Sequence, residues 1–340
     1  MDKDRYRPKV LVTLGDPAGI GPEICAGCMM DSEIQQFTRS VLIGDGGALK
    51  RGAAAMGIEN CRLNRIKTPE EGIFEAGIIN FIQPYEEEIS DIPFGKMSIQ
   101  GAKMAYSYIT QAIETAREWD ADLITTAPIN KESFLLAGLP HKDHTAIFNS
   151  YYPGIRTESM FHCRELRVFH YTRHMSLKQA IEALDEEKLF ESVREINRVL
   201  ISLGIEKPRI AIAALNPHAS DDGMFGDEEE KYLKPAVNRG REAGILVDGP
   251  VPADAVFYLQ IKGQYDGILS LFHDQGHIAC KSYDFEKSVS LTFGLPFMRS
   301  TVDHGTAYDL AGKGSASYEN IKEAILAGAD YCRGNLKQIK

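Results

Sequence analysis

The chain has no excess of positive charge. Its 340 residues carry 48 acidic side chains against 38 lysines and arginines, for a net charge of −10. A nucleic-acid or acidic-membrane partner needs a clustered positive field, so this balance argues against both. It does not exclude a small anionic ligand, because a few local cations decide that. No apolar run reaches the roughly 18 residues of a membrane span.

Cysteine is sparse and scattered. The six cysteines stand at positions 25, 28, 61, 163, 280 and 332, which is not the pattern of a disulfide framework in a chain of this length. Cys25 and Cys28 lie in a predicted helix without a second pair, so we interpret them as core thiols rather than a metal or redox motif. The charged N-terminus runs directly into a strand and does not resemble a signal peptide. We expect a reducing, cytoplasmic compartment.

Short apolar strands alternate with helical patterns throughout the chain. Several strands are nearly continuous apolar runs, which predicts an α/β fold with largely parallel, buried sheets. The length allows two domain-sized cores. A long small-residue helix is expected at 98–119 and a final helix at 316–332. Strands are expected at 8–15, 40–45, 78–82, 121–128, 166–172, 209–215 and 267–272, with further β segments at 288–293 and 295–300.

The first strand ends in a glycine-rich turn that lacks the Gly-x-Gly-x-x-Gly fingerprint of ordinary dinucleotide-binding folds. The turn reads Gly15-Asp16-Pro17-Ala18-Gly19-Ile20-Gly21 and precedes a predicted helix. Strand, glycine-rich turn and helix together present backbone N–H groups to a ligand in many α/β proteins. A tight turn with structural glycines explains the same residues, and both interpretations stay open here.

Polar side chains follow several predicted strands. Ligands of open α/β sheets bind outside the carboxyl ends of the strands. Three imidazoles with an open fourth position form a catalytic metal arrangement. Their separations, 44 and 55 residues, make no local motif, so a polar cleft without metal remains an alternative on the residues alone. The side chains at the strand ends are Asn130, Lys131, His174, His218, His273 and Asp274.

Other polar residues also allow two interpretations. His144 and Thr145 stand at a predicted helix start, where they are either an N-cap or part of an anion site. Lys281 and Arg299 are either solvated charges or substrate-binding cations, and Arg299 lies four residues before the Asp303-His304-Gly305-Thr306 loop. We interpret His162, His170 and His277 as structural or surface residues. The acidic run 227–230 is expected to be a solvated helix start.

Several sequence blocks together resemble the 4-hydroxythreonine-4-phosphate dehydrogenase family, over nearly the whole chain from Thr13 to about Gly314. The Gly-Ile-Gly-Pro-Glu and His-Gly-Thr-Ala pieces also resemble the isocitrate and isopropylmalate dehydrogenase superfamily, which binds NAD without the usual fingerprint. The blocks are Thr13-Leu14-Gly15-Asp16-Pro17-Ala18-Gly19-Ile20-Gly21-Pro22-Glu23, His144-Thr145, Asn216-Pro217-His218, His273-Asp274-Gln275-Gly276, Gly294-Leu295-Pro296-Phe297 and Val302-Asp303-His304-Gly305-Thr306-Ala307.

The resemblance implies a homodimer of two-domain α/β/α subunits, like the isocitrate and isopropylmalate dehydrogenases, with an active site shared between subunits. Residues 1–145 with 285–340 would form the cofactor-side domain, and 146–284 the substrate, metal and dimerisation domain. The family's divalent metal would be bound by His174, His218 and His273, one of them from the partner subunit. Imidazole ligands favour zinc, cobalt or manganese over magnesium, although availability in the cell can override that preference.

The family's functional positions transfer onto further residues. Asp254 or Asp274 would relay a proton, and Lys281 is a further catalytic candidate. The cofactor, NAD or NADP, would lie against two segments. The implied substrate-binding residues are His144, Thr145, Lys281, Ser290 and Arg299. The implied cofactor-binding residues are Gly15, Asp16, Asp303, His304, Gly305, Thr306 and Asp309.

The implied reaction is oxidation of a 4-phosphorylated four-carbon hydroxy acid at C3, followed by decarboxylation of the β-keto acid. Ser290 stands where the biosynthetic enzymes carry asparagine, and Asn130 where they carry histidine. These departures speak against a 2-amino substrate and resemble the catabolic branch more closely, and we rank the two branches nearly level. Pyridoxal phosphate biosynthesis would use 4-phosphohydroxy-L-threonine, and D-threonate catabolism 4-phospho-D-threonate or 4-phospho-D-erythronate. A metal-dependent hydrolase and a phosphate acyltransferase are the alternatives, and NADH formation or coenzyme A dependence separates them.

Overall fold

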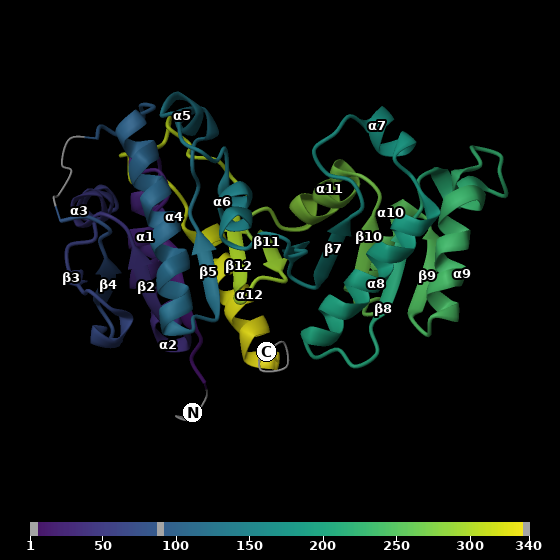
Figure 1. Cartoon of the computed structure of the whole chain (residues 1–340), viewed down its shortest axis with the longest axis horizontal. Coiled ribbons are helices and arrows are strands. Elements are labelled where there is room, and N and C mark those ends of the chain that lie inside the picture. Colours follow the sequence, from purple (N-terminus) through teal and green to yellow (C-terminus); the bar gives the residue numbers. More distant parts are fainter. Residues whose placement is uncertain (1–5, 87–91, 336–340) are drawn as a thin grey trace. The chain divides into compact units, whose positions relative to one another are not determined.

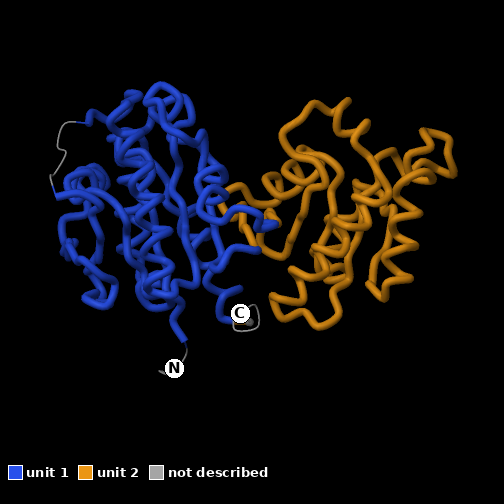
Figure 2. The backbone as a smooth tube through the Cα atoms, viewed as in Figure 1, with its two compact units in different colours: residues 1–157, 294–333 blue, residues 158–293, 334–340 orange. Residues whose placement is uncertain are grey.

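The structure is a computed structural model that describes residues 6–86 and 92–335. It divides into two compact units (Figure 2), unit 1 with residues 1–157 and 294–333 and unit 2 with residues 158–293 and 334–340. The chain thus changes unit at 157/158 and 293/294, where the sequence analysis placed the crossings at 145/146 and 284/285. Residues 288–293 pair with residues 158–163, so both segments belong to one sheet of unit 2.

Unit 1 is built on a parallel sheet (Figure 1). Its central strands are buried at almost every position, as expected for strands covered on both faces. The edge strand β3 (Arg62–Arg65) is polar and is exposed or half-exposed at every position. In sheet order the strands are β3 (Arg62–Arg65), β4 (Ile78–Ile82), β2 (Arg39–Ile43), β1 (Lys9–Thr13), β5 (Leu123–Thr126) and β12 (Met298–Val302).

The long helix of unit 1, α4 (Ile99–Trp119), confirms the helix predicted at 98–119. The Ser98 side chain accepts a hydrogen bond from the Gly101 N–H at 3.0 Å and caps its first turn. The alanine-rich face of α4 packs across β1, β2 and β5. The other helices of unit 1 are α1 (Gly21–Met30), α2 (Ser32–Phe37), α3 (Gly46–Ala55), α5 (Lys131–Leu136), α6 (His144–Tyr151), α12 (Glu319–Asn335) and the turn η1 (Pro69–Glu71).

Unit 2 has a mixed sheet. One strand, β6, runs antiparallel to both of its neighbours, and the remaining pairs are parallel. The strands predicted at 166–172, 209–215 and 267–272 are confirmed, each ending two residues earlier than expected. In sheet order the strands are β11 (Ser288–Phe293), β6 (Glu158–Cys163), β7 (Leu166–His170), β10 (Gly267–Ser270), β8 (Arg209–Ala213) and β9 (Leu246–Val251).

Helices cover both faces of the unit 2 sheet. On one face, α11 (His273–Tyr283) packs against Val168 of β7, since a Cβ on its Gly276 would lie 2.8 Å from that side chain. On Gly267 of β10, a Cβ would lie 3.4 Å from Phe169 of β7 and 2.9 Å from Leu200 of α8 (Glu186–Ser202). Successive strand residues point to opposite faces, so these two helices lie on opposite sides. The remaining elements are α7 (Leu177–Glu182), α9 (Lys234–Glu242), α10 (Ala253–Ile261), η2 (Pro217–Ser220) and η3 (Glu229–Leu233).

The predicted α/β class with largely parallel sheets is confirmed. Among the described residues no helix is long and apolar enough to cross a bilayer. All six cysteines are free thiols, and burial raises the pKa of Cys25 and Cys28. The structure therefore agrees with core thiols at the Cys-x-x-Cys pair.

Candidate functional site

The two predicted cofactor segments of unit 1 interlock. The buried carboxylate of Asp16 accepts a hydrogen bond from the Tyr308 hydroxyl at 2.6 Å and another from the Ala18 N–H at 2.9 Å. Burial raises the pKa of Asp16. The Ile20 N–H donates to the Thr306 carbonyl oxygen at 3.0 Å. The glycine-rich turn after β1 and the 303–312 loop therefore form one structural element.

The backbone of this element needs glycine at Gly15, whereas Gly305 leaves open space. Gly15 has a φ of +71°, and a Cβ there would lie 2.5 Å from the Pro128 carbonyl oxygen. Gly305 is exposed and has no atom within 4 Å of a Cβ position. His304 Nδ1 lies 3.0 Å from the Gly305 carbonyl oxygen, and Asp309 is exposed. The loop offers an accessible backbone surface at Gly305.

Arg299, on β12, is a buried cation. Its side chain is 7% exposed, and its Nε makes no hydrogen bond within the described part of the chain. The guanidinium carbon lies 5.1 Å from the centre of the Phe148 ring. Burial lowers the pKa of Arg299 to about 10. A desolvated guanidinium with an unsatisfied donor suits a bound anion.

His144 lies in the same environment. The N-cap of α6 is Asp143, whose carboxylate accepts the Ala146 N–H at 2.9 Å, so neither His144 nor Thr145 is the cap. The Nε2 atom of His144 is enclosed and has no hydrogen-bond partner among the described residues. Burial, followed by the charges of Arg299 and Lys131, lowers the pKa of His144 well below its ordinary value. Burial therefore disfavours a charge on this imidazole, and Thr145 is exposed beside it.

Asn130, at the end of β5, is occupied locally. Its side-chain oxygen caps α5 by accepting from the Ser133 N–H at 2.7 Å and the Ser133 hydroxyl at 3.0 Å. That hydroxyl lies 3.4 Å from the Tyr308 hydroxyl, which links Asn130 to the Asp16 network. Lys131 is exposed. Asn130 thus orders the strand end instead of offering its oxygen to a ligand.

Unit 2 brings together two of the three predicted metal ligands. The ring centres of His174 and His273 lie 5.6 Å apart. His273 Nδ1 lies 2.7 Å from the Asp274 carboxylate, which leaves Nε2 as its outward ring nitrogen. The two rings border a pocket of 280 Å³. Its other lining residues are Arg173, Met175, Leu177, Phe272 and Asp274.

His218 stands on a strained loop in η2. Residues 218 to 222 all have left-handed φ values, between 42° and 75°, although none is glycine. Each such residue costs roughly 1–2 kcal/mol, and backbone strain of this kind gathers at functional sites. His218 Nδ1 lies 3.0 Å from the Asp221 carboxylate, so its Nε2 also faces outward. Within the described residues no group of three metal-ligating side chains converges, so His218 lies outside the His174–His273 pair.

The carboxylate of Glu229 holds this loop, contrary to the prediction of a solvated acidic run. Glu229 is fully buried and accepts the backbone N–H groups of Leu215 at 3.0 Å and Asn216 at 2.7 Å. The Asn216 amide also donates to Glu229 and to Glu228, each at 2.8 Å. Asp227 and Glu230 are exposed at the start of a helix, as predicted. The prediction was wrong for Glu229, because the partners of its carboxylate are backbone groups 13 and 14 residues earlier.

The remaining predicted site residues of unit 2 lie on several elements. Asp254 is exposed in the first turn of α10, which packs near η2. Lys281 lies two turns after His273 on α11, with its Nζ 5.3 Å from the Phe285 ring centre. Ser290 on β11 pairs with Phe161 on β6. Asp221, Glu229 and the interaction between His170 and His277 were not predicted from the sequence. The His-x-x-x-His spacing on α11 was the one available signal.

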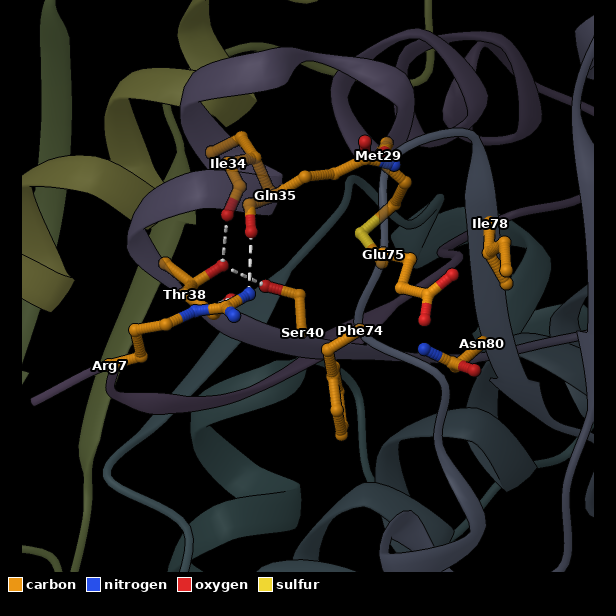
Figure 3. A pocket seen from close by; sticks show the side chains of 10 residues that line it. All are labelled: Arg7, Met29, Ile34, Gln35, Thr38, Ser40, Phe74, Glu75, Ile78 and Asn80. Carbon is orange, nitrogen blue, oxygen red and sulfur yellow. Dashed lines mark hydrogen bonds between the residues drawn. The ribbon is translucent and has the colours of Figure 1, made fainter. Parts of the chain in front are cut away.

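A further pocket in unit 1 lies at the opposite, amino ends of β1, β2 and β4 (Figure 3). Its volume of 20 Å³ suits a water molecule and not a substrate. The Arg7 guanidinium in this pocket donates to the carbonyl oxygens of Gln35 and Thr38, and Thr38 Oγ1 lies 2.6 Å from Ser40 Oγ. These contacts satisfy backbone groups between α2 and β2, so we assign the pocket to structure.

Comparison with known proteins identifies the family of this chain. Residues 36–327 match the family model described as "Pyridoxal phosphate biosynthetic protein PdxA". A "Putative D-threonate 4-phosphate dehydrogenase" of Symbiobacterium thermophilum is 42% identical over 325 residues, covering 96% of this chain and 97% of that protein. The chain is therefore similar to these proteins over most of its length.

Two solved structures add to the comparison. The 4-hydroxythreonine-4-phosphate dehydrogenase of Klebsiella pneumoniae superposes with a TM-score of 0.87 at 34% identity, covering 97% of this chain and all of that chain. A branched-chain phosphotransacylase of Enterococcus faecalis superposes with a TM-score of 0.52 at 12% identity, covering 95% of this chain and 98% of that chain, which shows the fold alone.

The fold and the relatives define the class of protein as a dehydrogenase that acts on a CH–OH group. The chain belongs to the PdxA family, whose model spans most of its length.

Proposed function

We propose that the chain oxidises 4-phospho-D-threonate at C3 with NAD and a divalent metal, and that the resulting β-keto acid loses CO2. The 42% identical relative named for this substrate supports the choice. Ser290 supports it as well, because a small hydroxyl side chain makes no demand for a 2-amino group. The biosynthetic substrate, 4-phosphohydroxy-L-threonine, and 4-phospho-D-erythronate are the comparison substrates.

The proposed metal requirement rests on the hydrogen bonds that hold the histidine rings. A carboxylate holds Nδ1 of both His218 and His273, which fixes the tautomer that directs a basic Nε2 outward. This carboxylate–histidine arrangement is the usual outer layer of a protein metal site. His174, His218 and His273 would hold the ion, which supplies Lewis acidity for oxidation of a hydroxyl and for loss of CO2.

We assign the third ligand to a second copy of the chain. His174 and His273 pair within one chain, and His218 stands on an exposed loop outside that pair. In a two-fold homodimer the same surface of each copy faces the other copy. The loop that carries His218 in each copy can therefore complete the metal site of its partner. The strain in residues 218 to 222 would then serve to present His218 to the partner subunit.

The phosphate and the carboxylate of the substrate both require positively charged partners. Arg299 offers a planar guanidinium with an unsatisfied Nε, which suits a phosphate or carboxylate. His144 and the exposed Thr145 would supply further hydrogen bonds in unit 1. In unit 2, Lys281 and Ser290 are the proposed substrate contacts.

One carboxylate remains for proton transfer. Asp274 lies 2.7 Å from His273 Nδ1, so we assign it to orienting that ring. Asp254, exposed on α10 near η2, is then the proposed proton relay, with Lys281 as the further catalytic group.

NAD, the hydride acceptor, would lie against Gly15, Asp16 and the loop that carries Asp303, His304, Gly305, Thr306 and Asp309. The open space at Gly305 fits a cofactor that approaches the backbone. NADP would use the same surface.

The test is NADH formation by the purified protein with each of the three substrates, before and after chelation and with metal restored. We expect metal-dependent NADH with 4-phospho-D-threonate as the preferred substrate. Phosphate release without NADH would support a hydrolase, and coenzyme A dependence would support an acyltransferase. If metal-loaded, folded protein forms no NADH with any of the three substrates, the proposal is contradicted.

A further inference from the structure

A second pair of imidazoles lies directly behind His273. His277 is one turn further along α11, and its Nδ1 lies 3.1 Å from Nε2 of His170, the last residue of β7. His170 is buried at 9% exposure, and His277 is half-buried. Neither belongs to the residues assigned to metal, substrate or cofactor above.

The ring of His277 is held between two other rings. On one side the His273 ring lies 3.8 Å away between centres, with 9° between the planes. On the other side Phe161 of β6 lies 4.1 Å away, with 25° between the planes. Phe161 is 3% exposed, so its position is fixed by the core. The stack Phe161–His277–His273 therefore connects the sheet to the outward-facing imidazole.

Hydrogen bonding joins the two imidazoles to each other and to the backbone of α11. His277 Nδ1 lies 3.1 Å from the His273 carbonyl oxygen as well as 3.1 Å from His170 Nε2. A carbonyl oxygen only accepts, so at least one of the two ring nitrogens carries a proton, and one imidazole donates to the other. Burial, followed by the neighbouring His277, lowers the pKa of His170 to about 3, so burial disfavours a charge on this ring.

Glycine and strand register allow this close approach. A Cβ on Gly276 would lie 2.5 Å from His170 Nε2 and 2.8 Å from Val168, so only glycine lets α11 seat here. Phe161 pairs with Val168 on one side and Ser290 on the other. Directly opposite residues share a sheet face, so Phe161 and Ser290 both point toward α11. Sequence and register together place the rings behind His273.

We propose that His170, His277 and Phe161 are positioning residues that fix the ring plane of His273 for metal binding. The proposal rests on the metal site of the proposed function. Asp274 holds His273 at Nδ1, but one hydrogen bond leaves the ring free to tilt about it. The parallel stack removes this freedom, and the His170 contact fixes the plane of His277 itself. Residues that orient a ligand from behind typically contribute 10–100-fold to metal affinity.

The experiment is titration of Co²⁺ into chelator-treated full-length protein, followed by calorimetry and by the visible absorption of the bound ion. His170→Leu removes the hydrogen-bonding partner of His277, and His170→Gln keeps a group that can donate or accept near the Nε2 position. His277→Phe keeps the stack and removes the hydrogen bond. His162→Gln is the matched control, because His162 is also buried on β6 but neighbours Phe161 along the strand and so points to the other face.

We expect His170→Leu and His277→Phe to weaken Co²⁺ binding about tenfold and to alter its absorption spectrum. His170→Gln should stay within about threefold of the wild type, and His162→Gln should match it. His218→Ala, which removes a proposed ligand, should lose more affinity than any of these. Thermal unfolding of each apoprotein shows whether the variant is folded.

The outcomes separate the two proposals. Folded His170→Leu and His277→Phe with wild-type affinity and spectrum would overturn the positioning role, while a defect in His218→Ala would leave the metal site standing. Wild-type protein that binds no Co²⁺ would overturn both. If one of these two variants unfolds, the Co²⁺ affinity of the other tests the positioning role. Unfolding of both would assign the pair to the core and contradict the proposal.

Discussion

The candidate residues of unit 1 and unit 2 differ in burial and in their hydrogen-bond partners. In unit 1 Arg299 is 7% exposed and His144 Nε2 is enclosed, with no hydrogen-bond partner at either Nε of Arg299 or Nε2 of His144 among the described residues. In unit 2 the side chains of His218 and His273 are 69% and 38% exposed, and each has a carboxylate on Nδ1.

This difference shows what each unit lacks. A buried cation is costly until an anion neutralises it, which supports the proposed binding of a phosphate or carboxylate by Arg299. Exposed imidazoles cost little, but they bind a metal only when enough of them converge. In our proposal, unit 1 therefore binds an anionic group of the substrate, whereas unit 2 binds the metal together with a second copy of the chain.

The largest expected effect comes from His218→Ala. Loss of a proposed metal ligand should lower kcat/KM by about 10³-fold or more. Because His218 is mostly exposed, the melting temperature of the apoprotein should not fall. Steady-state kinetics, metal content and thermal unfolding together check this prediction. Full activity in the variant, with the chelated wild type also active, would remove metal from the mechanism.

Arg299→Met should separate function from stability in unit 1. Removal of the guanidinium should lower kcat/KM by about 10²-fold, because a charge-assisted contact to an anion is lost. The free energy of unfolding should stay level or rise by about 1 kcal/mol, because a desolvated cation is replaced by a hydrophobe of similar length. Urea unfolding measures the second effect. A clear loss of stability would show that Arg299 holds the fold together.

Buried histidine also makes unit 2 sensitive to acid. Burial, followed by Arg167, lowers the pKa of His162 to about 4 from an ordinary value of 6.5. Between these values the unfolded chain binds a proton that the folded chain does not, so stability falls as the pH decreases from 6.5 toward 4. This group should cost about 2 kcal/mol between pH 7 and pH 5. His162→Gln should remove that share of the loss in urea unfolding at the two pH values, and an unchanged pH slope would contradict it.

The smallest expected effect is a change of substrate preference. Ser290→Asn should shift the ratio of kcat/KM values about fivefold toward 4-phosphohydroxy-L-threonine and away from 4-phospho-D-threonate. A carboxamide can accept a hydrogen bond from a 2-ammonium group that the shorter serine does not reach. Competition assays with both substrates give the ratio directly. An unchanged ratio and rate would show that Ser290 is not a selector.

The sequence predicted those parts of the molecule that local pattern determines. Apolar runs predicted β1, β5, β8 and β10, and the polar residues that follow them mark the carboxyl ends of the strands. The polar edge strand β3, the antiparallel β6 and the bulged β9 were not predicted, because their sequences show neither a continuous apolar run nor clean alternation.

Contacts between residues far apart in the chain could not be predicted from the sequence. Nothing near Glu229 indicates that backbone N–H groups of residues 215 and 216 enclose its carboxylate. The spacing of His170 and His277, 107 residues apart, carries no signal of their contact. The separations of the three metal candidates likewise do not show that two pair within one chain while the third stands alone.

The most direct test of a site shared between two copies uses mixed dimers. Chains carrying His218→Ala and chains carrying His273→Ala are produced together with different affinity tags, and the species with both tags is isolated. Each variant homodimer should be inactive, whereas the mixed dimer regains one intact site of two and should show about half of the wild-type kcat. A mixed dimer as inactive as its parents would contradict a metal site built from two subunits.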